Sequence, residues 1–216
     1  QTVIDRFSQI EPKVLFAGNG YQYGRKKQAR MKEIKAVAEA IVSIKTTIII
    51  PIIETGDDTD DSTPWSAVIS NSEAKLTFEP VDFNHPIWVL YSSGTTGKPK
   101  AITHSHGGVL LEHLKYMHLQ NDVHPGERFF WFTTTGWMMW NFLQAAMLAG
   151  ATPVLYDGSP AYPKLDTLWQ LAAELPIHHF GTSAPYLVAC MKKGLKPGKE
   201  FDFKHLKSIG STGAPL

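Results

Sequence analysis

The chain of 216 residues is long enough for one large domain or two small ones, and its 43% hydrophobic and 11% aromatic content can build a sizeable core. Its 21 basic and 20 acidic residues leave a net charge of +1, which favours neither a nucleic-acid partner nor a membrane surface. The single cysteine, Cys190, excludes an internal disulfide and a cysteine-based metal cluster, and no secretory signal opens the sequence. We therefore expect a globular protein of the reducing cytoplasm.

The first part of the chain has the pattern of a β-α-β unit. Residues 13–16 predict a short strand, residues 26–43 carry apolar side chains at helical spacing, and residues 46–50 are apolar on both faces. This order predicts a parallel strand pair, the start of a doubly wound sheet, in which ligands bind at the carboxyl ends of strands. Arg25 follows one such end, at the expected start of the helix, where a basic side chain fits poorly against the positive end of the helix dipole. Two roles of Arg25 therefore remain open: a solvated surface residue or part of an anion site.

Residues 57–61 and 62–86 predict surface segments. The acidic run 57–61 lacks the central glycine and the distal glutamate of an EF-hand, so it reads as a solvated loop. Residues 62–86 are rich in Pro, Ser and Asn without clear periodicity, which predicts a connection with at most one short helix or strand.

The most informative stretch is residues 91–100, Tyr-Ser-Ser-Gly-Thr-Thr-Gly-Lys-Pro-Lys, which follows an apolar run that predicts a buried strand over residues 87–90. Its two glycines let the backbone approach an anion closely, and four Ser and Thr hydroxyls and two lysines surround that backbone. The first glycine stands three residues before the second rather than five, and Pro99 follows Lys98, so a Walker A loop is disfavoured. The composition suits a polyphosphate.

His104 and His106 form a His-x-His pair that could suggest a metal. No carboxylate or third histidine is placed to complete such a site, so structural or loop-orienting roles are favoured. Residues 107–119 then predict a helix whose apolar face packs on a sheet.

Residues 129–156 contain no charged side chain and are long enough to raise the question of a membrane span. Polar residues, glycines and a proline interrupt them, so we predict instead a strand, a loop, a helix and a second strand of a buried core. The helix opens with residues 137–142, Trp-Met-Met-Trp-Asn-Phe, at the carboxyl end of a strand. Core packing and a binding pocket are both open for this run.

The α/β alternation continues with a helix over residues 165–175, a strand over 177–180 and a helix over 184–193, capped by Thr182 or Ser183. Residues 206–210 lead into a final turn, Ser-Thr-Gly-Ala-Pro. The start at Gln1 and the end without a closing element predict a fragment of a longer protein.

Residues 92–100 resemble the phosphate-loop signature of the adenylate-forming superfamily, which includes acyl-CoA synthetases, luciferases and peptide-synthetase adenylation domains. Residues 133–141 and 154–160 are most similar to the acyl-CoA synthetases that activate acetoacetate. The resemblance spans the whole chain and about the middle third of such an enzyme. It implies an α/β fold, with a doubly wound, mostly parallel sheet flanked by helices, as part of an N-terminal AMP-binding domain. Within it we expect a first β-α-β unit (1–61), a connection (62–86), and the phosphate loop with an acyl and nucleotide subdomain (87–216).

The resemblance also implies small-molecule substrates: acetoacetate is activated with ATP and Mg²⁺ to an acyl-adenylate, and CoA then takes the acyl group. The implied phosphate-binding residues are Ser92, Ser93, Gly94, Thr95, Thr96 and Gly97, with Lys100 supplying charge. The resemblance implies that adenosine and the α-phosphate are contacted by Gly213, Ala214 and Pro215. It also implies that Arg25 lies near a CoA phosphate. The implied acid pocket holds Trp137, Met138 and Met139, with Asn141 as a candidate partner of the keto oxygen.

Two alternatives remain open at this point. One is another short-chain acyl-CoA synthetase, acting on acetate or propionate, and the other is a non-catalytic nucleotide-binding module. Whether the parent enzyme acts on acetoacetate or on another short acid, we expect the isolated chain to be inactive. The reason is that the family's acylation lysine lies in a C-terminal domain beyond it.

Overall fold

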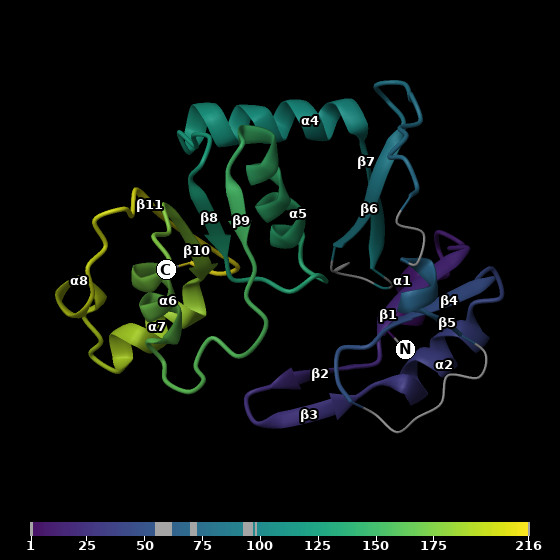
Figure 1. Cartoon of the computed structure of the whole chain (residues 1–216), viewed down its shortest axis with the longest axis horizontal. Coiled ribbons are helices and arrows are strands. Elements are labelled where there is room, and N and C mark those ends of the chain that lie inside the picture. Colours follow the sequence, from purple (N-terminus) through teal and green to yellow (C-terminus); the bar gives the residue numbers. More distant parts are fainter. Residues whose placement is uncertain (1, 55–61, 70–72, 93–96, 98, 216) are drawn as a thin grey trace. The chain divides into compact units, whose positions relative to one another are not determined.

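A computed structural model describes residues 2–54, 62–69, 73–92, 97 and 99–215. The chain divides into two compact units, Gln1–His106 and Gly107–Leu216 (Figure 1). The expected functional division at residues 61 and 86 stays a prediction. Among the described helices, none combines the length and the apolar character that a membrane crossing requires.

The first unit contains a parallel three-stranded sheet in the order β1-β4-β5. Its strands are β1 (Val14–Gly18), β4 (Thr46–Ile50) and β5 (Thr63–Pro64). Helix α2 (Met31–Ala40) lies between β1 and β4 in sequence, and its buried Met31 and Ile34 pack with Leu15 and Ile49 of the two strands. The predicted parallel pair is therefore confirmed, with Val14 opposite Thr46 and Gly18 opposite Ile50.

The helix predicted over residues 26–43 is wrong at its beginning. Lys26–Ala29 form a strand, β3, which pairs antiparallel with β2 (Gly20–Tyr23). Gly24 and Arg25 make the two-residue turn between them, and Gly24 has a φ of +60°, as tight hairpin turns require. Because the chain closes this hairpin first, α2 begins only at Met31.

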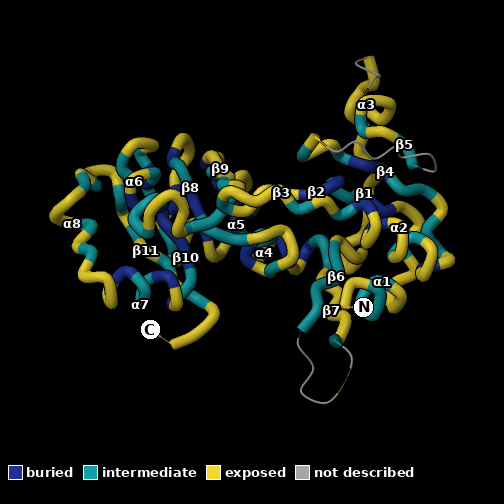
Figure 2. The backbone as a smooth tube through the Cα atoms, turned by 90° about the horizontal axis from the view of Figure 1, so that it is seen from below, coloured by how far each residue is buried: buried dark blue, intermediate teal, exposed yellow. Residues whose placement is uncertain are grey.

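The strand predicted as buried before the phosphate loop is only partly buried. It is β6 (Pro86–Ser92), which pairs antiparallel with β7 (Lys100–Ser105) in a two-stranded sheet. None of the described residues of either strand is fully buried, as the teal and yellow tube in Figure 2 shows. The rest of the unit comprises α1 (Thr2–Phe7) and α3 (Trp65–Val68). The predicted connection thus holds a short strand, β5, as well as a short helix, α3, where one short element was expected.

The second unit contains a parallel four-stranded sheet in the order β11-β10-β8-β9. Its strands are β8 (Arg128–Trp131), β9 (Thr152–Val154), β10 (His179–Ser183) and β11 (Ser208–Thr212). Its helices are α4 (His106–Lys115), which continues as the π-helix η1 (Tyr116–Gln120), α5 (Met138–Gln144), which continues as the 3₁₀ helix η2 (Ala145–Ala149), α6 (Thr167–Glu174), α7 (Ala184–Lys192) and α8 (Pro197–Glu200). The predicted order of elements is confirmed, although β10 begins two residues later than expected.

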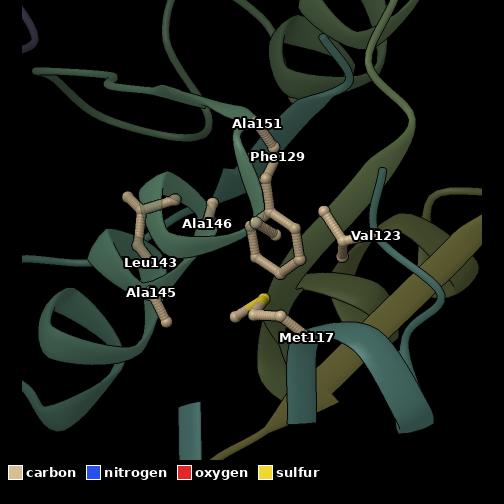
Figure 3. Close-up of a cluster of buried hydrophobic side chains, with 8 residues drawn as sticks. Met117, Val123, Phe129, Leu143, Ala145, Ala146 and Ala151 are labelled. Atoms are coloured by element: carbon tan, nitrogen blue, oxygen red, sulfur yellow. The ribbon is translucent and has the colours of Figure 1, made fainter. Parts of the chain in front are cut away.

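Helices cover both faces of this sheet. Phe129 and Phe130 are neighbours on β8, so their side chains point to opposite faces. Phe129 packs with Met117 of η1 and Leu143 of α5, and Figure 3 shows these side chains around its ring. Phe130 packs on the other side with residues of α6 and α7, among them Leu168. The doubly wound arrangement expected from the sequence is confirmed.

The helix predicted over residues 107–119 is present, but its apolar face is covered only in part. Val109 and Met117 are buried, whereas the side chains of Leu110 and Leu111 are 46% and 61% exposed. Periodicity identified the helix correctly and overestimated how much of it the sheet covers.

Candidate functional site

The base of the predicted phosphate loop is a pair of residues on a hairpin. Ser92 ends β6 and Lys100 begins β7, and the two stand directly opposite each other in the antiparallel register. Between them, Ser93, Gly94, Thr95, Thr96 and Lys98 lie outside the described residues. The two ends of the loop therefore lie side by side on the hairpin.

Helix α1 and the turn that follows it hold this base through contacts that the sequence did not reveal. The Tyr91 hydroxyl donates a hydrogen bond of 2.8 Å to the Arg6 carbonyl, and burial raises the pKa of Tyr91, which favours the protonated donor. Gln9 Nε2 donates to the Pro99 carbonyl at 3.0 Å. These residues lie about 85 to 90 positions apart, so no local pattern could have predicted the contacts.

At the carboxyl edge of the second sheet, the structure brings together two predicted residues. Trp137 is the N-cap residue of α5, and Gly213 follows the end of β11. A Cβ atom on Gly213 would stand 3.7 Å from the Trp137 ring, and the φ of +96° at Gly213 is one that a side chain disfavours. Ala214 and Pro215 continue from this turn and are exposed.

The predicted acid-pocket residues on α5 differ strongly in exposure. Met138 is 52% exposed, whereas Met139 is 6% exposed. Asn141 is half-buried, and within the described part of the chain its amide makes no hydrogen bond. Met138 and Asn141 are thus accessible to a ligand, while Met139 is part of the buried interior.

Arg25 lies at the tip of the β2–β3 hairpin and is exposed, so its expected position at a helix start is wrong. The carboxyl ends of β1 and β4 border a cavity of about 530 Å³ lined by Asn19, Ile52 and Trp65 among others. Asn19 is 6% exposed and fixes this edge, because its side chain accepts hydrogen bonds from the N–H groups of Ile52 and Ile53 at 2.8 and 3.0 Å.

A second cluster, which we call the amino-edge network, occupies the opposite edge of the second sheet and was not predicted. It comprises Glu127, His179, Lys207 and Ser208. His179 Nε2 lies 2.8 Å from Glu127 Oε2, and its Nδ1 lies 2.9 Å from Ser208 Oγ. Lys207 forms an ion pair with Glu127. Burial would raise the pKa of Glu127, but hydrogen bonds from Lys207, the His124 N–H and His179 outweigh it and lower that pKa to about 2.

The histidines show no arrangement that indicates a metal site. In the parts of the chain that the structure describes, no group of three or more His, Cys, Asp or Glu side chains could hold a metal ion. His85 and His106 instead pack ring against ring, with centroids 5.6 Å apart.

Comparison with known proteins gives a match over nearly the whole chain. The profile of the family described as AMP-binding enzyme matches residues 2–216. The acetoacetyl-coenzyme A synthetase of Rhizobium meliloti (strain 1021) is 42% identical over 223 residues, which cover 100% of this chain and 34% of that protein. The acetoacetyl-CoA synthetase of Gallus gallus is 38% identical, over 99% of this chain and 33% of that protein.

A solved structure agrees with these relatives. The acetoacetyl-CoA synthetase from Streptomyces lividans superposes with a TM-score of 0.93 at 46% sequence identity, and the match covers 100% of this chain and 33% of that one. The chain thus spans about a third of the length of the proteins it matches. The chain belongs to the family of AMP-binding enzymes.

Proposed function

We propose that this chain is the nucleotide- and acid-binding part of an acid–thiol ligase. The acetoacetate carboxylate attacks the α-phosphorus of ATP, which gives acetoacetyl-adenylate and pyrophosphate. The CoA thiol then attacks the acyl carbon and displaces AMP, which gives acetoacetyl-CoA. We also propose the reducing cytoplasm as its compartment.

One observation carries the proposal: the whole chain aligns, at 46% identity, with the acetoacetyl-CoA synthetase from Streptomyces lividans. The fold is compatible with that chemistry, since the two ends of the predicted phosphate loop and Gly213 stand at strand ends and in a turn. The phosphate loop begins at Ser92 and ends at Lys100, and the turn at Gly213 follows β11.

In this reaction the protein positions reactants and stabilises charge, and no residue of the chain acts as a nucleophile. Hydroxyls and backbone N–H groups of residues 92–97 bind the β- and γ-phosphates, and Lys100 stabilises the negative charge of the leaving pyrophosphate. The turn at residues 213–215 lies against adenosine and the α-phosphate. Trp137 and Met138 bind the acid, with Asn141 as the partner of its keto oxygen, and Arg25 binds a CoA phosphate.

Magnesium fits this proposal as an ion that arrives with the nucleotide. Mg²⁺ commonly binds substrate phosphates and water with one or two carboxylates, rather than a cage built only of protein groups. Bound there, the ion would neutralise phosphate charge, while the hydroxyls of the loop orient the same phosphates.

The test is product formation by an enzyme of the relatives' length that carries this chain. Incubated with ATP, Mg²⁺, CoA and acetoacetate, it is expected to form acetoacetyl-CoA, AMP and pyrophosphate in equal amounts. Formation of ADP and phosphate, or of a thioester only with another acid, would contradict the proposal.

A further inference from the structure

The Trp131 ring lies over two glycines of the second sheet. A larger residue at either position would leave no room for it. Trp131 ends β8, and in the register of the sheet it stands opposite Gly181 of β10, which stands opposite Gly210 of β11. A Cβ atom on Gly181 would come within 2.1 Å of the indole, and one on Gly210 within 2.6 Å. The indole therefore extends from its own strand across β10 to β11, and neither neighbour could carry a side chain.

Two aromatic rings thus lie beside this strand, one at Gly210 within β11 and one at Gly213 just past its end. The outer atoms of the Trp131 indole, Cζ3 and Cη2, lie at Gly210, whereas the Trp137 ring lies at Gly213. Thr212 is between them, half-buried, and its side chain points to the same face as Gly210 because strand side chains alternate. At a rise of about 3.3 Å per residue, the backbone positions of Gly210 and Gly213 are about 10 Å apart.

An interval of this length can accommodate a short acyl chain. Each ring takes up part of the 10 Å through its van der Waals thickness, since carbon atoms approach to about 3.5–4 Å. What remains suits a chain of a few carbon atoms. The half-exposed Met138 follows Trp137 on the same helix and adds apolar surface.

We propose that the Trp131 indole forms the inner end wall of the acid-binding site and so limits the length of the acid that the enzyme accepts. The inference rests on the proposed function, in which the carboxylate of the acid lies at the Gly213 turn beside the α-phosphate. The acyl chain then runs along β11 toward Gly210 and ends against the indole. Trp131 is held there by edge-to-face packing on Phe142, with ring centroids 5.4 Å apart.

The experiment compares acids of increasing length in Trp131 variants of the complete enzyme. The readout is kcat/KM in acid-dependent ATP–pyrophosphate exchange, measured with acetoacetate, 3-oxohexanoate, butyrate and hexanoate. The phenyl ring of Trp131→Phe no longer reaches Gly210, and Trp131→Leu opens the interval further. Because one methylene in an apolar pocket changes kcat/KM by about 10-fold or more, the ratio of 3-oxohexanoate to acetoacetate should rise at least tenfold in Trp131→Leu. Trp131→Phe should give an intermediate ratio.

Trp140→Leu is the matched control, because Trp140 packs against the same core cluster as Trp131, whereas the atoms nearest to Gly181 and Gly210 are those of Trp131. It should leave both length ratios unchanged. If Trp131→Leu does not fold, the Trp131→Phe ratio decides alone. Unchanged ratios in the folded Trp131 variants, or an equal rise in Trp140→Leu, would overturn the inference. Failure of the proposed function would look different: acetoacetate would then be no substrate of the parent enzyme, and the ratio of hexanoate to butyrate would still test the wall.

Discussion

The two edges of the sheet in the second unit differ in how completely their side chains are paired. At the amino edge, the nearly buried Glu127 carboxylate has partners in Lys207, His179 and the His124 N–H, and His179 also reaches Ser208. At the carboxyl edge, Met138 is exposed, and the Asn141 amide makes no hydrogen bond within the described residues.

The difference assigns separate tasks to the two edges. Buried charges are tolerated only when they are paired, and removal of one partner is then costly, so the loss of Glu127 from the amino-edge network should be destabilising. An exposed apolar side chain and an unpaired amide can instead interact with a ligand. Substitutions at the amino edge should therefore change stability most, and those at the carboxyl edge should change substrate use.

The largest expected effect is on stability. Glu127→Ala leaves His179, which is 2% exposed, without its carboxylate partner, and should lower the free energy of unfolding by about 3–5 kcal/mol. Urea denaturation measures the loss. The control is Glu112→Ala, whose exposed ion pair with Lys115 on α4 should contribute almost nothing. Equal losses in the two variants would mean that the network does not stabilise the sheet.

A smaller effect, on rate, is expected at the hairpin of the first unit. Lys100→Ala should lower the rate of ATP–pyrophosphate exchange about 10- to 150-fold, which corresponds to about 1.5–3 kcal/mol for a hydrogen bond to a charged group. Stability should change little, because Lys100 is exposed. Lys115→Ala, which removes an exposed lysine of α4, is the matched control and should exchange at the parental rate. An unchanged rate in Lys100→Ala would remove this lysine from the mechanism.

The two methionines of α5 allow the effects on substrate preference and on stability to be compared within the carboxyl edge. Met138→Trp should fill the space for the acid and shift the kcat/KM preference toward acetate by about tenfold, with unfolding unchanged. Met139→Trp should instead overpack the interior and cost about 1–3 kcal/mol of stability, since Met139 is 6% exposed. Parallel measurements of kcat/KM for acetate and acetoacetate and of the urea midpoint distinguish the effect on substrate preference from the effect on stability. If Met138→Trp keeps the parental preference, the acid binds elsewhere.

The smallest effect is a pH dependence at the amino edge. Burial lowers the pKa of His178, whose Nδ1 accepts a hydrogen bond from the Arg128 N–H at 3.1 Å. Since the pKa is lower in the folded state, this contribution to stability is complete above pH of about 6.5 and is lost as the pH falls below it. Glu127, with a folded pKa of about 2, should add a second loss below pH of about 4.5.

Urea midpoints measured between pH 8 and pH 3 test this dependence. In His178→Asn, which keeps an acceptor but does not titrate, the decline that starts near pH 6.5 should be absent and the more acidic one should remain. An identical profile in the parent and in His178→Asn would exclude a contribution from His178.

Much of the fold could be predicted because its elements carry local signals. The β-branched run at 46–50 and the aromatic run at 129–132 are apolar on both faces, which is typical of strands covered by helices on two sides. The error at residues 26–29 has a physical cause: four residues of hairpin strand precede α2, and Gly24 alone indicates the turn that separates them. The partial exposure of β6 depends on its partner strand, which periodicity does not reveal.

The candidate site was predictable where it depends on motifs and not where it depends on distant contacts. The residues of the phosphate loop and the Gly213 turn stand in characteristic sequences. The contact of Tyr91 with Arg6 joins segments 85 residues apart, and Trp131 over Gly181 depends on strand register. A glycine in an apolar strand was the available signal, since it often marks a close approach by another group.

The most direct test of the central claim is ATP–pyrophosphate exchange in the absence of CoA, by an enzyme of the relatives' length that contains this chain. In the proposed reaction the first half forms acetoacetyl-adenylate, so labelled pyrophosphate should enter ATP when acetoacetate and Mg²⁺ are present. We expect kcat/KM for acetoacetate to exceed that for acetate at least tenfold. Exchange that needs no acid, or that is faster with acetate, would contradict the account.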